Sequence, residues 1–350
     1  MNKIKIYFAL LLVGVLSFQS QAQEKKKYQV GIIGFYNVEN LFDTINQPDV
    51  NDEEFTPEGA NRYTPQVYLD KLDKLTEVLS QIATDVSPDG FSILGCAEIE
   101  NKSVLEDLCR HPKLKNRNYQ IVHYNSPDVR GVDVAMLYNP KYFTPKFSES
   151  LYVELKNADG NLYYTRDILY CSGDYLGETI HIMVGHWPSR RGGEQASAPG
   201  RAKAASVCKH KVDSIRAVNP NAKIIVMGDL NDDPTSYSVA KVLNATGKIS
   251  EAKNDKMYNP WTGYYNKGIG TLAYNDAWNL FDQIIISPAW LNKEQAGFFY
   301  KKAVIFKKEF MLQNDGRFKG YPLRTYDFNR YVGGYSDHFP TYLLMLKETK

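Results

Sequence analysis

The stretch KIIVMGDLN, residues 223–231, contains the strongest strand signal in the sequence and closes with two polar side chains. Its first part is almost wholly apolar and β-branched, a pattern typical of a strand that is buried on both faces of a sheet. Asp229 and Asn231 are two positions apart, so a turn at the strand end presents both on one side while Leu230 returns to the core. We therefore expect a buried strand that delivers a carboxylate and an amide to one edge of a sheet.

Apolar runs of strand length recur on both sides of this stretch and alternate with helical periodicity. Strands are predicted at residues 30–36, 91–97, 132–138, 162–170, 179–185 and 281–287. A helix is predicted over residues 65–82, because Thr64 is a suitable N-cap and apolar residues follow at spacings of three and four. A second helix is expected at residues 201–215, and the acidic segment 43–63 is expected to be a long loop. Residues 23–350 should form one α/β domain with both sheet faces covered.

Polar side chains lie at the margins of these predicted strands, where strand ends gather at a sheet edge. They are Asn37, Glu98, His186, Asp229, Asn231, Asp282 and the adjacent Asp337 and His338. Each alone is more often a turn, cap or structural residue. Together they supply hard oxygen ligands, two imidazoles and an amide donor, and nothing suited to a soft metal. The set therefore favours a site for a hard divalent cation.

Hydrolysis of a phosphate ester requires groups of these kinds. The reacting oxygens gain negative charge, and Mg²⁺ neutralises such charge while binding one or two carboxylates and several waters. Glu98 is the leading direct ligand. His338, with Asp282 on its other ring nitrogen, is the predicted base that activates water. Asp229 is expected to align that water, and Asn231 to donate to the phosphoryl oxygens. A calcium loop is the alternative for residues 228–234, but the segment lacks the Gly and the distal Glu of an EF-hand.

Several short motifs occur in an order that is informative as a set. They are FYNVENLF (35–42), AE (97–98), RGVDVA (130–135), GHWPSR (185–190), GDLN (228–231), FDQ (281–283) and SDHFP (336–340). Together they resemble the endonuclease/exonuclease/phosphatase superfamily, which has the deoxyribonuclease-I-like fold, and the likeness is greatest to bacterial secreted members. The resemblance implies a four-layer α/β sandwich, in which two packed mixed β-sheets are flanked by helices and the active site lies where loops of both sheets meet.

The resemblance also implies roles for individual residues. The catalytic residues would be His186, Asp229, Asn231, Asp282 and His338, and the metal-side residues Asn37, Glu98 and Asp337. The expected ion is Mg²⁺, with Mn²⁺ or Ca²⁺ as alternatives. His186 would contact the phosphate or act as an acid. Two departures from the family pattern occur: Ala97 precedes Glu98 where many members have Gln, and Glu39 stands where some members have Asp near the metal.

The loop HWPSRRGGE, residues 186–194, bears on the choice of substrate, because it resembles loops in extracellular bacterial nucleases of this superfamily. The candidate substrate-binding residues are Arg130, Trp187, Arg190 and Arg191, with Arg201 as a further candidate. The adjacent arginines would hold phosphates and the tryptophan would stack on a base or sugar. In the alternative interpretation, the tryptophan packs beneath the loop and the arginines pair with nearby acids. We expect a nuclease with nucleic acid as its partner; the alternative is a phosphatase or phosphodiesterase for a small sugar-, inositol- or lipid-phosphate.

The first residues predict export. Lys3 and Lys5 precede an apolar run over residues 6–16, and a small-residue cleavage pattern ends at Ala22. This pattern is typical of a signal peptide, and the run is too short for a comfortable membrane span. We therefore expect residues 1–22 to be removed and the mature protein to be periplasmic or secreted, monomeric and without stable membrane insertion.

The charge and cysteine patterns argue against a general polyanion-binding protein and against a zinc protein. The chain has 42 basic and 40 acidic residues, and removal of Lys3 and Lys5 leaves 40 of each, so strong non-specific attraction to a polyanion is not expected. The four cysteines are scattered, with no CxxC or Cys/His pattern, so the sequence does not predict a zinc site. Their disulfide pairing is not fixed by the sequence.

Overall fold

Two large β-sheets dominate the computed structural model, which describes residues 26–157, 159–294 and 296–349. The first sheet has the order β16 (Phe299–Ile305), β19 (Thr341–Thr349), β1 (Lys27–Leu41), β2 (Ile93–Ile99), β4 (Asp133–Tyr138) and β3 (Gln120–His123). The second has the order β11 (Ala245–Thr246), β12 (Met257–Tyr258), β15 (Asp282–Ile286), β10 (Lys223–Asp229), β9 (Glu178–His186), β8 (Ile168–Tyr175) and β5 (Phe143–Leu151). Both sheets are mixed: β1 and β2 run parallel, as do β9 and β10, whereas β19 is antiparallel to β1. The predicted signal peptide, residues 1–22, lies outside the described residues.

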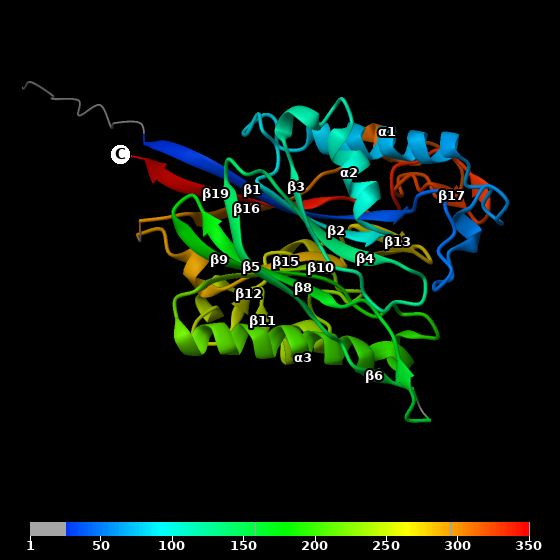
Figure 1. Ribbon diagram of the computed structural model, residues 1–350. Helices are drawn as coiled ribbons and strands as arrows, with labels where there is room; N and C mark the ends of the chain where they lie inside the picture. The colour runs from blue at the N-terminus through cyan, green and yellow to red at the C-terminus, as the bar shows by residue number, and fades with distance from the viewer. Residues whose placement is uncertain (1–25, 158, 295, 350) are drawn as a thin grey trace, which may run out of the picture.

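Helices cover the outer face of each sheet, and Figure 1 shows the resulting four layers. The first sheet carries α1 (Pro65–Gln81) and α2 (Lys102–Arg110), and the second carries α3 (Glu194–Val218). The smaller elements are α4 (Thr262–Tyr265) and the strand pairs β6 (Leu155–Lys156) with β7 (Leu162–Tyr163), β13 (Leu272–Tyr274) with β14 (Ala277–Asn279), and β17 (Tyr326–Asp327) with β18 (Arg330–Tyr331). The expected four-layer α/β sandwich is confirmed. Among the described residues, no helix is long and apolar enough to cross a membrane.

The surroundings of β10 explain why its sequence is apolar at successive positions instead of alternating between apolar and polar residues. Ile225 and Met227 point into the core between the two sheets, whereas Ile224 and Val226 point into the core beneath α3. Successive strand residues face opposite sides of a sheet, so a sheet covered on both faces needs apolar residues at every position. Each fully buried aliphatic side chain of this kind stabilises the fold by about 1.5–3 kcal/mol. Packing on both faces therefore holds the end of β10, and the motif that follows it, in a fixed place.

Most predicted elements are present, but several bounds were wrong. The strand predicted at residues 30–36 runs from Lys27 to Leu41, so Asn37 lies inside the strand and not at its end. The predicted helix begins at Pro65, and the Thr64 hydroxyl accepts a hydrogen bond from the Val67 N–H at 3.4 Å. The strand predicted over residues 162–170 is interrupted, since β7 ends at Tyr163 and β8 begins at Ile168; the intervening Arg166 turns inward, where its guanidinium is hydrogen-bonded. The helix predicted over residues 201–215 extends instead from Glu194 to Val218 and includes Pro199.

All four cysteines carry free thiols, and Cys96, Cys171 and Cys208 are buried. Burial raises the pKa of the Cys171 and Cys208 thiols to about 12. A buried thiol with a raised pKa is a poor nucleophile and metal ligand. The three buried cysteines therefore act as small apolar core residues.

Candidate active site

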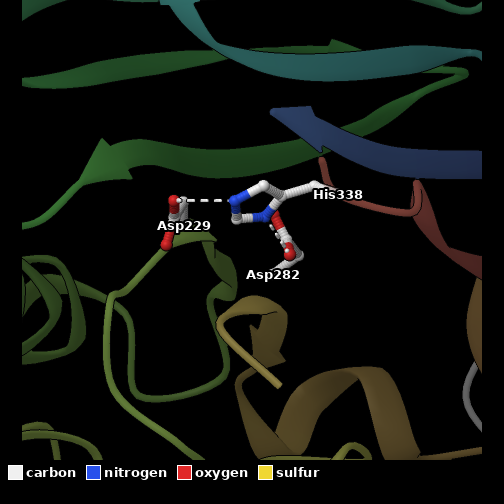
Figure 2. A group of neighbouring side chains, drawn as sticks. All are labelled: Asp229, Asp282 and His338. Carbon is white, nitrogen blue, oxygen red and sulfur yellow. Dashed lines mark hydrogen bonds and ion pairs between the residues drawn. The ribbon is translucent and has the colours of Figure 1, made fainter. Parts of the chain in front are cut away.

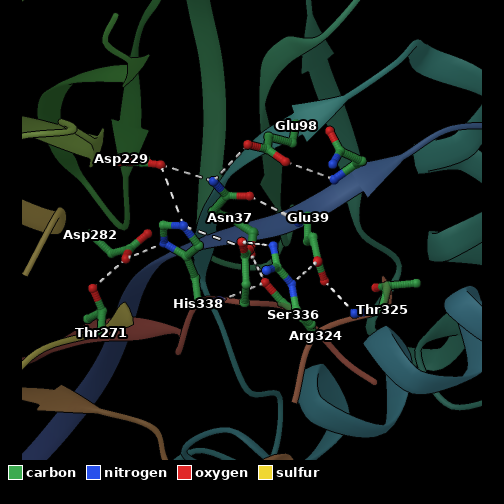
Figure 3. Close-up of polar contacts among 12 residues, drawn as sticks. Asn37, Glu39, Glu98, Asp229, Thr271, Asp282, Arg324, Thr325, Ser336 and His338 are labelled. Carbon is green, nitrogen blue, oxygen red and sulfur yellow. Dashed lines mark hydrogen bonds and ion pairs between the residues drawn. The ribbon is translucent and has the colours of Figure 1, made fainter. Parts of the chain in front are cut away.

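The polar side chains selected from the sequence lie together where strand ends of the two sheets meet. Figure 3 shows Asn37, Glu98, Asp229, Asp282 and His338 gathered around one place, although they come from distant parts of the chain. Asn37 and Glu98 belong to β1 and β2 of the first sheet, whereas Asp229 and Asp282 belong to β10 and β15 of the second. The site thus bridges both halves of the sandwich.

Strand register places three of these groups on neighbouring strands. Asp229, the last residue of β10, is paired with His186 in the parallel ladder to β9 and with Asp282 in the antiparallel ladder to β15. Because β15 runs in the opposite direction, its first residue lies at the edge where β9 and β10 end. The preceding residue, Gly228, has no room for a side chain, since a Cβ there would lie 2.0 Å from the backbone oxygen of Gly185. The glycine of the GDLN motif therefore permits the close strand approach that places Asp229.

Glu98 is directed into the site by a break in its strand. The ladders of β2 with β1 and with β4 both shift register here, between Ala97 and Ile99 on β2, and Glu98 has a φ of 64°. A non-glycine residue in this left-handed region costs about 1–2 kcal/mol. The cost is offset by fixed contacts, because one carboxylate oxygen, Oε2, accepts a hydrogen bond from the Asn40 N–H at 2.9 Å. The bulge thus removes Glu98 from the pleat and aims its other oxygen at the site.

Asn231 is held in a similar way after β10. It has a φ of 48°, and its N–H donates to Asp229 Oδ1 at 3.0 Å. Its side-chain Nδ2 donates to the backbone oxygen of Trp187 at 3.0 Å. Leu230 between them is fully buried, as its expected return to the core requires. The turn therefore fixes the orientation of the Asp229 carboxylate.

Asn37 joins the two sheets at the centre of the site. Its Nδ2 donates to Glu98 Oε1 at 3.3 Å and to Asp229 Oδ2 at 3.0 Å, while its Oδ1 accepts from the Glu39 N–H at 3.0 Å. These partners fix which end of the amide faces which neighbour, because a carboxylate only accepts and a backbone N–H only donates. In this arrangement Asn37 orients two carboxylates, and a direct metal bond from its oxygen would require the amide to turn over.

His338 and Asp282 form the acid–histidine pair that the sequence predicts, as Figure 2 shows. The ring Nδ1 lies 2.7 Å from Asp282 Oδ2, which also accepts from the Thr271 hydroxyl at 2.5 Å. The other ring nitrogen, Nε2, lies 3.8 Å from both Asp229 Oδ2 and Asp337 Oδ1. Burial by itself lowers the pKa of His338, but Asp282, Asp337 and Asp229 outweigh it and raise this pKa well above its ordinary value. The surrounding carboxylates therefore favour the imidazolium form.

His186 is a second histidine beside Asp229. Its Nε2 lies 3.6 Å from Asp229 Oδ2 and 3.9 Å from Glu98 Oε1. Burial, together with the positive charges of Arg166 and Arg130, lowers the pKa of His186 well below its ordinary value. Burial raises the pKa of Asp229 to about 6, against the opposing effect of His338. The two histidines thus share Asp229 as a neighbour, while their pKa values are shifted in opposite directions.

The donor set fits a hard divalent ion. One ligand atom from each of Asp229, Asp282 and His338 lies within 4.8 Å of the others, so this trio could hold a metal. Asp282 Oδ2 and His338 Nδ1 already bond to each other, whereas Asp282 Oδ1 has no hydrogen-bond partner within the described residues and Asp229 Oδ2 lies 3.8 Å from His338 Nε2. The carboxylates of Glu98 and Asp337 are more open, with 14% and 35% of their side chains exposed. Carboxylate oxygens of this kind match Mg²⁺, Mn²⁺ or Ca²⁺ rather than a soft metal.

Comparison with known proteins decides the family. Residues 32–347 match the Endonuclease/Exonuclease/phosphatase family. The chain belongs to this family. It is therefore a phosphoesterase of a family that depends on divalent metal. A search of curated proteins found no match to the sequence.

Solved structures share this family's fold at low sequence identity. A family protein from Bacteroides thetaiotaomicron has 15% identity and a TM-score of 0.54, with 93% of this chain and 100% of that chain covered. A mannosyl-6-phosphatase from the same organism has 15% identity and a TM-score of 0.53, with coverage of 90% and 99%. D. rerio TDP2 complexed with a single-strand DNA product has 14% identity and a TM-score of 0.54, with coverage of 90% and 98%. These likenesses show the fold alone.

A partly buried ionic cluster next to the active site was not predicted. Glu39 has a φ of 52°, and its Oε2 accepts from the Thr325 N–H at 2.7 Å. Arg324 donates to Glu39 Oε1 at 3.4 Å and to Asp337 Oδ2 at 3.2 Å. Burial, together with repulsion from Asp337, raises the pKa of Glu39 to about 7. Glu39 is thus bound to the segment that carries Asp337, and this contact fixes one wall of the site.

Lys71 of α1 is the fourth member of this cluster. It is buried, and its ammonium donates to the Thr325 hydroxyl at 2.5 Å and to the Tyr335 backbone oxygen at 3.0 Å, with Glu39 Oε2 3.9 Å away. A sequence signal for it exists: Lys71 lies four residues before Leu75, on the apolar face of the helix. A lysine at a core position of a helix indicates a buried partner, because an unpaired buried charge is costly.

Two hydroxyl groups were also missed. Ser336 donates to the backbone oxygen of Asn37 at 2.7 Å and accepts from the His338 N–H at 3.1 Å, while Thr271 binds Asp282. They connect β1 and β15 to the His338 segment. Serine and threonine are common in turns, so neither residue stands out in the sequence.

The prediction that Trp187 stacks on substrate is wrong. Only 1% of this residue is exposed, and its ring packs with Ala204 and Cys208 of α3 and Met183 of β9. The alternative interpretation, in which the ring packs beneath the loop, describes the structure. The apolar ring gains more from burial against α3 than from exposure at the loop surface.

The predicted arginines divide into bound and exposed groups. Arg201 is fully buried and pairs with Asp232 at 2.7 Å, so its role as a phosphate ligand is also wrong. Arg190 pairs with Asp232 at 3.3 Å and with Asp233 at 3.1 Å, and its guanidinium lies over a phenyl ring. Arg130 and Arg191 remain exposed at least in part. Asp232 and Asp233, which follow the GDLN motif, therefore pair with candidate phosphate ligands: Asp232 with Arg190 and Arg201, and Asp233 with Arg190.

Proposed function

We propose that the protein hydrolyses a small phosphate ester, with Mg²⁺ as its metal, rather than nucleic acid. The observation that carries the catalytic part of this proposal is the meeting of the His338–Asp282 pair with Asp229 and Glu98 around the Asn37 amide. Family membership supports phosphate ester hydrolysis at this site. The choice of metal rests on the hard oxygen donors.

The side chains divide the chemistry among them. Mg²⁺, when bound, would neutralise charge on the reacting oxygens, with Glu98 as its leading ligand. Asp229, oriented by the Asn231 N–H, is placed to align the attacking water and take its proton. His338 already has three carboxylates around its ring, so it suits donation to a phosphoryl oxygen better than proton abstraction. This allocation replaces our expectation that His338 is the base.

The preference for a small ester comes from the side chains that a nuclease would use. Trp187 and Arg201 are buried, and Arg190 pairs with two acids. Binding of a nucleic acid depends strongly on free cationic groups that neutralise its phosphates. The chain after residue 22 has equal numbers of acidic and basic residues, so it offers little general attraction to a polyanion.

A nuclease is the second candidate, favoured by two arginines. The Arg130 side chain is 40% exposed, and Arg191 lies exposed on the loop before α3. Both would contact the backbone of a bound strand. A nuclease that relied on them would lose affinity for a strand as salt concentration rises.

A substrate panel distinguishes the two candidates. The chain from residue 23 would be incubated with Mg²⁺ and hexose phosphates, inositol phosphates, sphingomyelin, plasmid, single-stranded DNA and RNA. We expect metal-dependent hydrolysis of a small ester that stops with a chelator. Rapid cleavage of nucleic acid without hydrolysis of any small ester would overturn the preference, and inactivity on every substrate with every divalent metal would overturn the function.

We also propose that the protein is exported by residues 1–22. The support is the charged, apolar and small-residue pattern of that segment. Expression of the whole chain in a Gram-negative host, followed by fractionation and N-terminal sequencing, tests the proposal. We expect a mature chain that begins at Gln23 outside the cytoplasm; an unprocessed cytoplasmic chain would contradict it.

A further inference from the structure

A pocket of about 330 Å³ opens beside the active site, between the segment that precedes α1 and the hairpin β17–β18. The residues used below, Asn40, Glu54, Asn61, Arg324, Asp327 and Phe328, all line it. Phe55 also contributes, and it stacks on Phe42 with ring centroids 4.1 Å apart. The long acidic loop, to which the sequence assigns no role, therefore forms one wall of this pocket on an aromatic base.

The pocket shares residues with the catalytic carboxylates. Asn40 donates its N–H to Glu98 at 2.9 Å, and Arg324 donates to Asp337 at 3.2 Å. A phosphate positioned at Glu98 and Asp337 would therefore extend its organic substituent toward the pocket. A cavity of this volume is at the small end of ligand sites, which suits one ring better than a polymer.

Phe328 is the most unusual residue of the pocket. It is 93% exposed, and it occupies the turn between β17 and β18 with a φ of 53°. A bulky residue in the left-handed region is an outlier, and an exposed phenyl ring gains nothing from burial in the free protein. Both features are accounted for if the ring serves as a platform that a ligand covers.

The polar groups of the pocket suit hydroxyl groups rather than phosphates. Asn61 is only 7% exposed as a residue, but its side-chain amide makes no hydrogen bond within the described part of the chain and keeps its polar atoms open to solvent. An amide placed in this way can donate to and accept from a ligand in the pocket. Glu54 adds an acceptor, and Asp327 adds another while its Oδ2 pairs with Arg330 at 3.0 Å. Arg324 is the one cation among the lining residues and is already engaged by Glu39 and Asp337. An acidic, amide-lined pocket repels a polyanion and offers donors and acceptors to a neutral polyol.

We propose that this pocket binds the alcohol part of the substrate as a sugar-sized, polyhydroxylated ring, stacked on Phe328 and hydrogen-bonded by Asn61. The proposal rests on the proposed hydrolysis of a small phosphate ester and names the class of that ester. The apolar C–H face of the ring covers the phenyl group, and the hydroxyl groups meet the amide and carboxylate groups. Phe328 and Asn61 would therefore determine which alcohol is accepted without taking part in catalysis, because neither residue touches the reacting phosphate.

The test compares Phe328→Ala with Phe318→Ala, a change at another exposed phenylalanine that does not line the pocket. The substrates are the 6-phosphates of glucose, mannose and galactose, with methyl phosphate as an ester that leaves the pocket empty. Phe328→Ala should raise KM for the best hexose phosphate roughly three- to tenfold, the effect of one aromatic contact, and leave kcat and methyl phosphate hydrolysis unchanged. Asn61→Ala should also raise this KM, and Phe318→Ala should change nothing.

The outcomes separate this proposal from the proposed function. Metal-dependent hydrolysis with the same KM in wild type and Phe328→Ala, or no preference for any hexose phosphate over methyl phosphate, would overturn the pocket proposal alone. If no ester is hydrolysed, the proposed function fails, and calorimetric titration with the free hexoses still decides the pocket. Saturable binding to wild type that weakens in Phe328→Ala would support the proposal, and an absence of binding would overturn it.

Discussion

Replacement of the carboxylate behind His338 gives the sharpest test of the site. In Asp282→Asn, the charge-assisted hydrogen bond at 2.7 Å to His338 Nδ1 is lost while the size of the side chain is kept. A hydrogen bond to a charged group contributes about 1.5–3 kcal/mol, so if the bond is needed only in the transition state, kcat/KM should fall by about 10- to 150-fold. The pKa of His338 should also fall, because Asp282 is a main cause of its rise. Steady-state hydrolysis of the best ester measures the first effect, and NMR titration of the imidazole measures the second.

Two further variants make this prediction specific. Thr271→Val removes the other donor to the same carboxylate oxygen and should cost less, about 2- to 12-fold, because a neutral hydrogen bond contributes about 0.5–1.5 kcal/mol. Asp276→Asn changes an exposed carboxylate that pairs with Arg317, and it should leave kcat/KM unchanged. If Asp282→Asn keeps kcat/KM within twofold of wild type, while circular dichroism shows a folded protein, the pair does not serve catalysis and the reasoning fails.

Three other outcomes are expected. Mg²⁺ at 100 times its Kd should stabilise the fold by about 2.7 kcal/mol and raise Tm by a few degrees. Glu98→Ala should abolish this rise in Tm. A wild-type Tm that does not change with metal would contradict the assignment of the metal site. Trp187→Ala should cost about 3–5 kcal/mol of stability in urea unfolding, because the ring is buried. Trp187→Phe should cost much less and leave KM unchanged. A raised KM in a stable Trp187→Phe variant would instead support stacking of Trp187 on the substrate. Arg201→Met should lower stability in urea unfolding, but by less than the about 3–5 kcal/mol of an unpaired buried charge, because Asp232 loses Arg201 and keeps Arg190 as a partner. Arg191→Met should leave urea unfolding unchanged, and equal stability of the two variants would refute the structural role of Arg201.

Local pattern was enough to find the residues of the site but not all of their partners. GDLN was recognisable because an apolar strand ends at a carboxylate, and Glu98 and His186 are marked by the same change from apolar to polar. Lys71 was missed because helical periodicity treats it as one polar residue on an amphipathic helix. Trp187 was assigned to the substrate because a tryptophan beside arginines has the same sequence pattern whether it faces solvent or α3.

The sequence by itself determined the strand and helix types, the hard-oxygen chemistry and the family motifs, because these depend on neighbours a few residues apart. Only the tertiary structure decided that Asn37 orients two carboxylates, that Asp232 and Asp233 engage candidate phosphate ligands, and that a pocket lies between the long loop and Phe328. Those outcomes depend on side chains from distant segments competing for the same space and the same hydrogen bonds. Such competition is settled by the packing of the two sheets and not by the local order of residues.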